Sequence, residues 1–183
     1  MLARIILLAL LPAAVLSTAI APESISTFCQ SPTVISEVYI GEQKNVKVDA
    51  ISCANKVTDV VQIEKRQTPV NVCGAQCDTH CFPPSGGGPD PNECHVISDA
   101  LLYDSQNVGA LFNIPANASV ITMQFRSCKS FFVNQAGIDE QYCRTDWSAV
   151  LDFVAFNCQS QQNAHGGLCV AADQRWFIQV QHV

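Results

Sequence analysis

The side chains best suited to acid–base chemistry are few and widely spaced. Four histidines are scattered along the 183 residues: His80, His95, His165 and His182. Glu93 and His95, together with Arg126, have the residue types of a ribonuclease site. The alternative is that Glu93 caps the start of a helix and that His95 faces solvent on that helix. We favour the alternative, because the sequence Asp90-Pro91-Asn92-Glu93 is a helix-capping pattern.

Motifs that position a nucleophile, a catalytic metal or a phosphate are missing as well. The sequence contains neither G-x-S-x-G nor H-E-x-x-H. Gly86-Gly87-Gly88 is followed by Pro and Asp, whereas a phosphate-binding loop continues with Lys and Ser or Thr. These glycines therefore predict a flexible turn. We expect no enzymatic activity, no catalytic residue and no cofactor.

Ten cysteines leave three kinds of chemistry open: reactive thiols, metal binding and disulfides. Cys73, Cys77 and Cys81, with His80 or His95, have the residue types of a zinc site. Zinc sites of this kind usually show paired C-x2-C knuckles, and the spacing here is C-x3-C. We therefore predict disulfides and no bound metal.

The N-terminal residues support disulfides, because they predict export to an oxidising compartment. Arg4 supplies a positive charge, residues 5–16 form an apolar run, and Ser17-Thr18-Ala19 has the small residues that a signal peptidase recognises. We predict a signal peptide over residues 1–19 and a secreted, extracellular protein. The apolar run is shorter than the roughly 20 residues that a membrane helix needs. No membrane insertion is expected.

The charge balance disfavours a nucleic-acid partner. Lys and Arg number 10 against 16 Asp and Glu, which gives a net charge of −6. Residues 67–183 carry all of this excess, with ten acidic and four basic residues. Such a surface repels phosphate backbones, so nucleic acid is not an expected partner.

The dibasic pair Lys65-Arg66 lies in a polar stretch before Pro69 and suits a kexin-type processing protease. Cleavage there makes residues 20–66 a propeptide and Gln67 the new N-terminus. The alternative is an ordinary solvated linker. The propeptide has two segments of alternating polarity plus Cys29 and Cys53, so we predict a small hairpin closed by its own disulfide.

The eight cysteines that remain in residues 67–183 predict a domain with four disulfides: Cys73, Cys77, Cys81, Cys94, Cys128, Cys143, Cys158 and Cys169. Spacing alone does not select among the many pairings of eight cysteines. One pair looks local, because a turn at Gly166-Gly167 would bring Cys158 close to Cys169. Cys158–Cys169 is the only one of the four pairings that we assign.

The remaining pattern predicts an α+β domain. Residues 70–88 are turn-rich and predict a loop pinned by disulfides. A helix is expected to start at Asp90 and end near Ser105, and a second helix is expected over residues 142–158 with Thr145 or Asp146 as its cap. Expected strands cover residues 109–114, 119–125, 129–134 and 175–183.

Several segments resemble, in the same order, the cysteine-rich glycan-binding proteins secreted by mushrooms, of the inky-cap lectin type. The matching segments are Cys73-Gly74-Ala75-Gln76-Cys77, residues 91–97, residues 125–134, Tyr142-Cys143, residues 166–169 and Arg175-Trp176. The resemblance implies a single-domain α-β-α sandwich stapled by disulfides. It also implies binding of N-acetylhexosamine-containing glycans or glycoproteins, in defence or in antagonism of other organisms.

A second class fits the same features: the disulfide-rich α/β killer toxins of fungi, some of which are processed at Lys-Arg. We favour glycan binding and keep the killer toxin as the alternative. For glycan binding, the segment around Cys128 offers polar side chains beside aromatic ones. The predicted glycan-binding residues are Arg126, Lys129, Asn134, Arg175 and Trp176. Asn117-Ala118-Ser119 is a glycosylation sequon, so we expect a glycan on Asn117.

Overall fold

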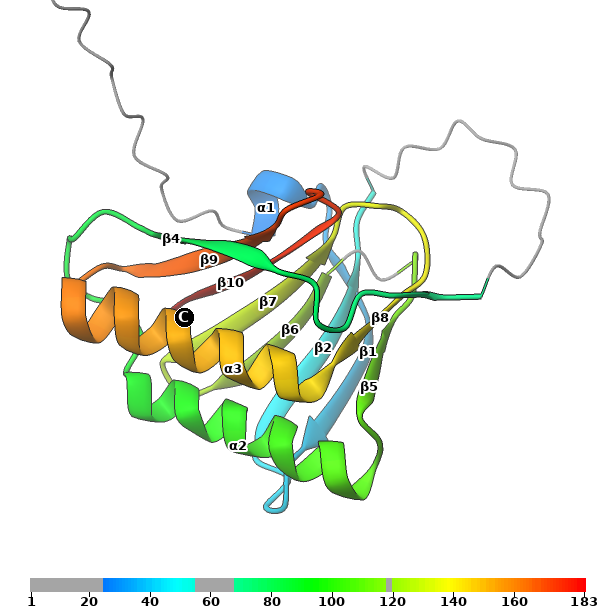
Figure 1. The fold of residues 1–183 in the computed structure, drawn as a ribbon, viewed down its shortest axis with the longest axis horizontal. Helices are drawn as coiled ribbons and strands as arrows, with labels where there is room; N and C mark the ends of the chain where they lie inside the picture. The colour runs from blue at the N-terminus through cyan, green and yellow to red at the C-terminus, as the bar shows by residue number, and fades with distance from the viewer. Residues whose placement is uncertain (1–24, 55–67, 118–119) are drawn as a thin grey trace, which may run out of the picture.

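The computed structural model describes residues 25–54, 68–117 and 120–183. The predicted signal peptide, the Lys65-Arg66 processing site and part of the Asn117 sequon lie outside these residues and stay predictions. The described residues form one large sheet, one small sheet and two long helices (Figure 1).

Seven antiparallel strands form the large sheet, in the order β1-β2-β6-β7-β10-β9-β4. Their bounds, in this order, are β1 (Thr33–Ile40), β2 (Val46–Ser52), β6 (Val120–Phe125), β7 (Cys128–Asn134), β10 (Trp176–His182), β9 (Gly166–Ala171) and β4 (Cys77–Cys81). The small sheet has the order β3-β8-β5, with β3 (Val70–Asn71), β8 (Glu140–Cys143) and β5 (Leu111–Ile114).

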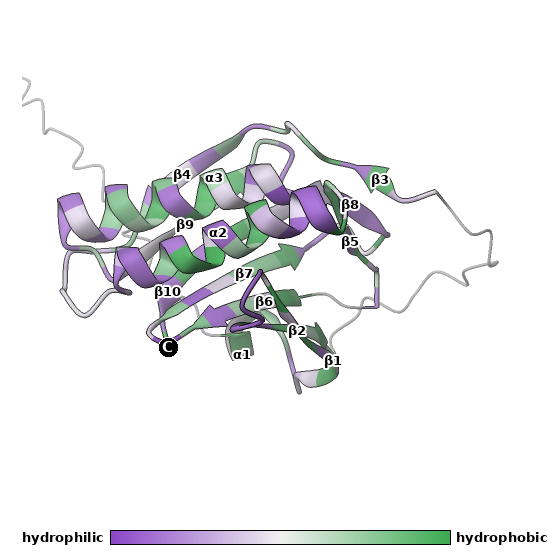
Figure 2. Cartoon of the chain, turned by 90° about the horizontal axis from the view of Figure 1, so that it is seen from below, coloured by the Kyte–Doolittle hydropathy of each residue, from purple (hydrophilic) through white to green (hydrophobic). Residues whose placement is uncertain are grey.

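The helices α2 (Pro91–Asn107) and α3 (Arg144–Val154) lie side by side on one face of the large sheet (Figures 1 and 2). The π-helix η1 (Ala155–Gln161) continues α3, and the four-residue helix α1 (Ile25–Phe28) lies on the opposite face. The α+β class and the disulfide framework are confirmed. The expected α-β-α layering is not, since the described residues place both long helices on the same side.

Strand alternation gives the second face of the large sheet both apolar and polar side chains. On β7, Cys128 and Phe132 belong to the core under the helices, whereas Lys129, Phe131 and Val133 point to the other face. On β10, the same alternation directs Gln181 to the face opposite the helices. Phe131 and Val133 are buried on this face in a second apolar cluster with the Cys29–Cys53 bridge, against which Phe28 of α1 packs.

The core under the helices is rich in aromatic rings. Trp176 stacks on Phe132, and Tyr142 packs against both rings. Trp147 of α3 is fully buried, and its indole N–H donates a hydrogen bond to Ser130 Oγ at 3.0 Å. This pairing removes the cost of burying the indole N–H.

The segment predicted as a propeptide hairpin is a hairpin in the structure. β1 pairs with β2, and Cys29 is bonded to Cys53 as predicted. The hairpin is not a separate unit, however, because β2 also pairs with β6. Residues 25–54 therefore form the first two strands of the same sheet as the rest of the chain.

The predicted bridge between Cys158 and Cys169 is wrong. Cys158 is bonded to Cys81, and Cys169 is bonded to Cys77. The reason is that Gly166 begins strand β9 instead of forming a turn, and β9 pairs with β4. The two remaining bridges are Cys73–Cys143 and Cys94–Cys128. Four disulfides within residues 67–183 are confirmed.

The secondary structure differs from the prediction in two further places. Residues 70–88 contain strands β3 and β4, although their composition predicts a loop. The second helix starts only at Arg144, because Tyr142 and Cys143 pair with β5. The start of α2 is as predicted: Asp90 is its N-cap, and the carboxylate accepts a hydrogen bond from the Asn92 N–H.

Candidate functional site

The five predicted glycan-binding residues fall into two groups. Arg126 lies in the turn before β7 and Lys129 at the start of that strand, whereas Asn134 lies at its end. Trp176 is paired with Asn134 across the ladder, and the Arg175 carbonyl accepts a hydrogen bond from the Gln135 N–H. The whole length of β7 therefore separates the two groups.

Two members of this set have structural roles. Trp176 is fully buried in the aromatic core. The Asn134 amide donates to the Ile138 carbonyl at 2.7 Å, and its oxygen accepts from the N–H groups of Ala136 and Gly137. These bonds hold the loop after β7, so the Asn134 side chain is already engaged.

The three basic residues of the set keep exposed or half-exposed side chains. Arg126 is 72% exposed, lies over the Phe125 ring and is 3.6 Å from the Glu93 carboxylate. Lys129 lies over the Phe131 ring at 5.6 Å, and burial lowers the pKa of its ammonium. Arg175 is 3.8 Å from the Asp173 carboxylate.

An open groove of about 470 Å³ lies between α2 and the turn that joins β1 to β2. We call it the α2 groove. Its lining residues come from the turn, from one face of α2 and from the end of β6: Gly41, Glu42, Gln43, Asn45, Val96, Asp99, Ala100, Tyr103 and Phe125. Two carboxylates, two amides and a phenol ring therefore surround one hollow, and no Lys or Arg is among its lining residues.

A close approach of the turn to α2 shapes this groove. Gly41 has φ +84°, and a Cβ at this position would lie 2.8 Å from the Ala100 Cβ, so glycine is required here. The Gly41 N–H donates a hydrogen bond to Oδ1 of Asp104, whose side chain is buried. This contact fixes the turn on the helix.

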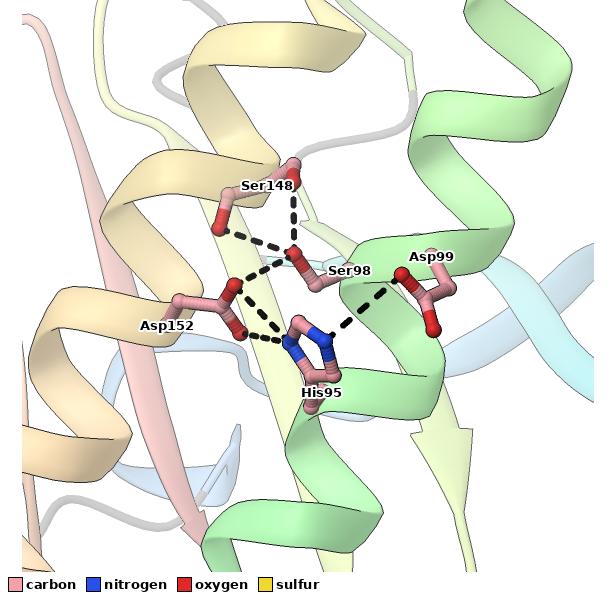
Figure 3. A network of polar contacts seen from close by, with 5 residues as sticks. All are labelled: His95, Ser98, Asp99, Ser148 and Asp152. Atoms are coloured by element: carbon pink, nitrogen blue, oxygen red, sulfur yellow. Dashed lines mark hydrogen bonds and ion pairs between the residues drawn. The ribbon is translucent and has the colours of Figure 1, made fainter.

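Next to the groove, α2 and α3 are joined by a polar network (Figure 3). Nδ1 of His95 lies 3.1 and 3.0 Å from the two carboxylate oxygens of Asp152, and Nε2 lies 3.7 Å from Asp99. Ser98 Oγ donates to Asp152 at 2.9 Å and lies 2.6 Å from Ser148 Oγ. Asp99 connects this network to the groove.

The network is not arranged as a catalytic triad. In a triad the serine hydroxyl bonds to the imidazole, whereas Ser98 here donates to the carboxylate that holds the same imidazole. The Asp152 hydrogen bond raises the pKa of His95, with smaller contributions from the charges of Asp152 and Asp99 against the opposing effect of burial. The arrangement therefore favours a protonated His95 bridging the two helices.

The residues of the ribonuclease alternative have different partners. The Glu93 carboxylate accepts hydrogen bonds from the Ser127 N–H and hydroxyl, and these bonds lower the pKa of Glu93. Glu93 thus joins α2 to the β6–β7 turn instead of closing a capping box. The His95 ring is directed to Asp152. Among the described contacts, none links Glu93 to His95.

The cysteine cluster considered for zinc has no thiolate to offer. Cys73, Cys77 and Cys81 are each in a disulfide. One group of ligand-type atoms in the described part of the chain is compact enough for a metal ion, and it consists of Cys73, Cys143 and Asp146. Its two sulfurs are bonded to each other.

A second hollow, of about 280 Å³, lies beside the small sheet and is lined in part by Asn113, Asp139, Glu140 and Gln141. Glu140 is fully buried, and neither carboxylate oxygen has a hydrogen-bond partner among the described residues. Burial raises the pKa of Glu140 to about 7, partly offset by the charge of Arg175. No sequence pattern singles out this carboxyl group.

Comparison with models of protein families finds no match for this chain, and no curated protein or solved structure matches it. None of the helices in the described residues has the length and apolar character needed to cross a membrane. All ten cysteines are in disulfides, as is typical of proteins from oxidising compartments.

Proposed function

We propose that this protein is a secreted, non-enzymatic glycan-binding protein that recognises N-acetylhexosamine-containing glycans through the α2 groove. The observation that carries the proposal is the chemistry of the groove. It combines the carboxylates of Glu42 and Asp99, the amides of Gln43 and Asn45 and the half-exposed ring of Tyr103. Neutral ligands with many hydroxyl groups are bound by this combination of donors, acceptors and an aromatic surface.

Each group in the groove suits one part of a sugar. Carboxylate oxygens accept hydrogen bonds from hydroxyl groups, and amides donate and accept, as an acetamido substituent requires. The Tyr103 ring offers a flat apolar surface for the C–H face of a pyranose. The groove volume of about 470 Å³ lies within the range of small-ligand sites. Arg126 follows the groove residue Phe125, so this predicted contact residue lies beside the groove.

A glycan array with the full secreted protein tests the proposal. We expect retention on glycans that contain N-acetylhexosamine, and the retention should depend weakly on salt, because no Lys or Arg lines the groove. An array without bound glycans contradicts the proposal. Steep loss of binding between low and moderate salt contradicts it too, because that dependence indicates an anionic ligand.

The killer-toxin alternative is tested with the same preparation. The disulfide-linked sheet with two helices is compatible with a small antagonist protein as well. Growth inhibition of yeast together with an empty glycan array favours this alternative. Glycan binding without growth inhibition favours the lectin-like function.

A further inference from the structure

The disulfides divide the chain into two parts that are not covalently cross-linked. Cys29–Cys53 closes the part formed by residues 25–54, and the other four bridges all lie between Cys73 and Cys169. No cysteine is left over for a bridge between the two parts. In the sequence, Lys65-Arg66 lies between them. Cleavage there would leave two chains with only non-covalent contacts.

These contacts are those of a domain interior. The β2–β6 ladder runs from the pair Lys47–Gln124 to the pair Ile51–Val120. On the helix side, the hairpin contributes Ile40, Val46 and Val48 to the main core.

On the other face of the sheet, Ile51 and the Cys29–Cys53 bridge belong to the same cluster as Phe131 and Phe177. The ring of Phe28 lies edge-on to both of these phenylalanines. The hairpin is therefore held on both faces of the sheet.

Loss of the hairpin would be costly for the remaining chain. β6 would become an edge strand with unpaired N–H and C=O groups over a length now bonded to β2. Apolar side chains that are now buried, such as Ile121 and Val120, would lose part of their cover. The Gly41 hydrogen bond to the buried Asp104 carboxylate would be broken as well.

The hairpin also supplies one wall of the α2 groove. Gly41, Glu42, Gln43 and Asn45 come from its turn, and the opposite wall comes from α2. A groove without the hairpin would lack one of its two carboxylates and both of its amides.

We propose that residues 25–54 are a retained, strand-donating subunit: after cleavage at Lys65-Arg66 they stay bound to the edge of β6, and the functional protein has two chains. The association rests on the β2–β6 ladder and on the apolar contacts of residues 25–54 on both faces of the sheet. Only its consequence for ligand binding rests on the proposed function.

The test is to treat the folded, unreduced full chain with a kexin-type protease. The products are analysed by denaturing mass spectrometry and by size exclusion under native conditions. We expect two fragments after denaturation and one native species with the summed mass. The proposal is overturned if the hairpin fragment elutes separately or is degraded by the protease. It is also overturned if the protease does not cleave the Lys65-Arg66 bond.

A matched pair of variants tests whether the buried face holds the hairpin. Val48 and Val38 are partners in the β1–β2 ladder, but Val48 is 4% exposed and Val38 is 50% exposed. In the cut protein, Val48→Ala should raise the dissociation constant of the hairpin about tenfold, and Val38→Ala should leave it unchanged. Circular dichroism of the uncut variants checks their folding. Equal effects of the two substitutions contradict the proposed interface.

Glycan binding by the cut protein separates this inference from the proposed function. A retained hairpin with no glycan binding before or after cleavage leaves the two-chain protein intact and overturns only the proposed function. Glycan binding that survives after the hairpin has dissociated overturns the retained-subunit role.

Discussion

Nδ1 of His95 on α2 lies 3.0 Å from a carboxylate oxygen of Asp152 on α3, and the same oxygen accepts a hydrogen bond from Ser98. This carboxylate therefore connects two side chains of α2 to the neighbouring helix. Since both helices cover the same core, the contact couples the protonation of one imidazole to the stability of the whole domain.

His95 should make the protein more stable at acidic pH. Its pKa in the folded state is raised, chiefly by the Asp152 hydrogen bond. The stabilisation is therefore complete below the unfolded pKa of about 6.5 and is lost as the pH rises through the folded pKa. Because the ring is half exposed, solvent screening limits the effect to less than about 1 kcal/mol.

Urea unfolding of wild type and His95→Gln at about pH 5.5 and 8.5 measures this contribution. His95→Gln should lower the free energy of unfolding at the acidic pH and have little effect at the basic pH. His182→Gln, at an exposed position near the C-terminus, is the control. A loss of equal size at both pH values in His95→Gln contradicts the role of the protonated ring.

Glu140 should also make the protein more stable at acidic pH, but the cause is burial of its carboxyl group. Burial raises its pKa to about 7, so the folded state holds the carboxyl proton more tightly than the unfolded state does. Stability is therefore highest below the unfolded pKa of about 4.5 and falls as the pH rises through the folded pKa, by up to about 3 kcal/mol.

The variant Glu140→Gln does not titrate, so it should lose this part of the pH dependence and gain stability relative to wild type above about pH 7. Urea unfolding between about pH 4 and 8 checks the prediction. Glu42→Gln, at an exposed position, is the control. An unchanged profile in Glu140→Gln is the contrary result.

The sequence predicts the elements whose signals are local. Asp90, Pro91 and the apolar stripe that follows them predict α2, and alternating residues predict β6, β7 and β10. The hairpin with Cys29 and Cys53 is also local, and its disulfide is confirmed.

The parts that the sequence does not predict depend on long-range packing. Cys77 and Cys169 are 92 residues apart and are brought together only when β4 pairs with β9. The composition of β4 conceals that strand, because closely spaced cysteines are typical of loops as well.

For the same reason, the sequence does not predict the α2 groove. Its walls come from a turn assigned to the propeptide and from a helix of the following domain, and no motif links Glu42 to Asp99. The predicted site instead follows the neighbouring strands β7 and β10, where alternation directs Asn134 and Trp176 into the interior.

Asn134→Ala should therefore affect stability and not glycan affinity. The substitution removes three hydrogen bonds of the loop after β7 and leaves their partners unpaired, at a cost of roughly 1–3 kcal/mol. Thermal or urea unfolding measures the loss. Gln135→Ala, at the exposed neighbouring position, should change stability by less than about 0.5 kcal/mol. An Asn134→Ala protein of wild-type stability but weakened glycan binding would restore Asn134 to the site.

The disulfide framework predicts an unreactive protein in thiol assays. All ten cysteines are bonded in five pairs, so an alkylating reagent should modify none of them before reduction. A chelator should leave the melting temperature unchanged, because no thiolate is free to bind a metal. Mass spectrometry before and after reduction counts the modified thiols. Alkylation of two or more cysteines in the unreduced protein contradicts the framework.

The groove makes the most specific prediction about binding. Asp99→Asn and Tyr103→Ala should each weaken the affinity for an N-acetylhexosamine glycan by roughly 1–3 kcal/mol, about 5- to 150-fold. Asp99→Asn removes the negative charge and one of the two acceptor oxygens that bind sugar hydroxyl groups, and Tyr103→Ala removes the aromatic surface. Tyr39→Ala is the matched control, since Tyr39 is an exposed tyrosine on β1 that does not line the groove. Isothermal titration measures the affinities, and unfolding in urea checks that the variants are folded. If Tyr39→Ala weakens binding as much as Tyr103→Ala, or if both groove variants bind as tightly as wild type, the ligand does not occupy the α2 groove.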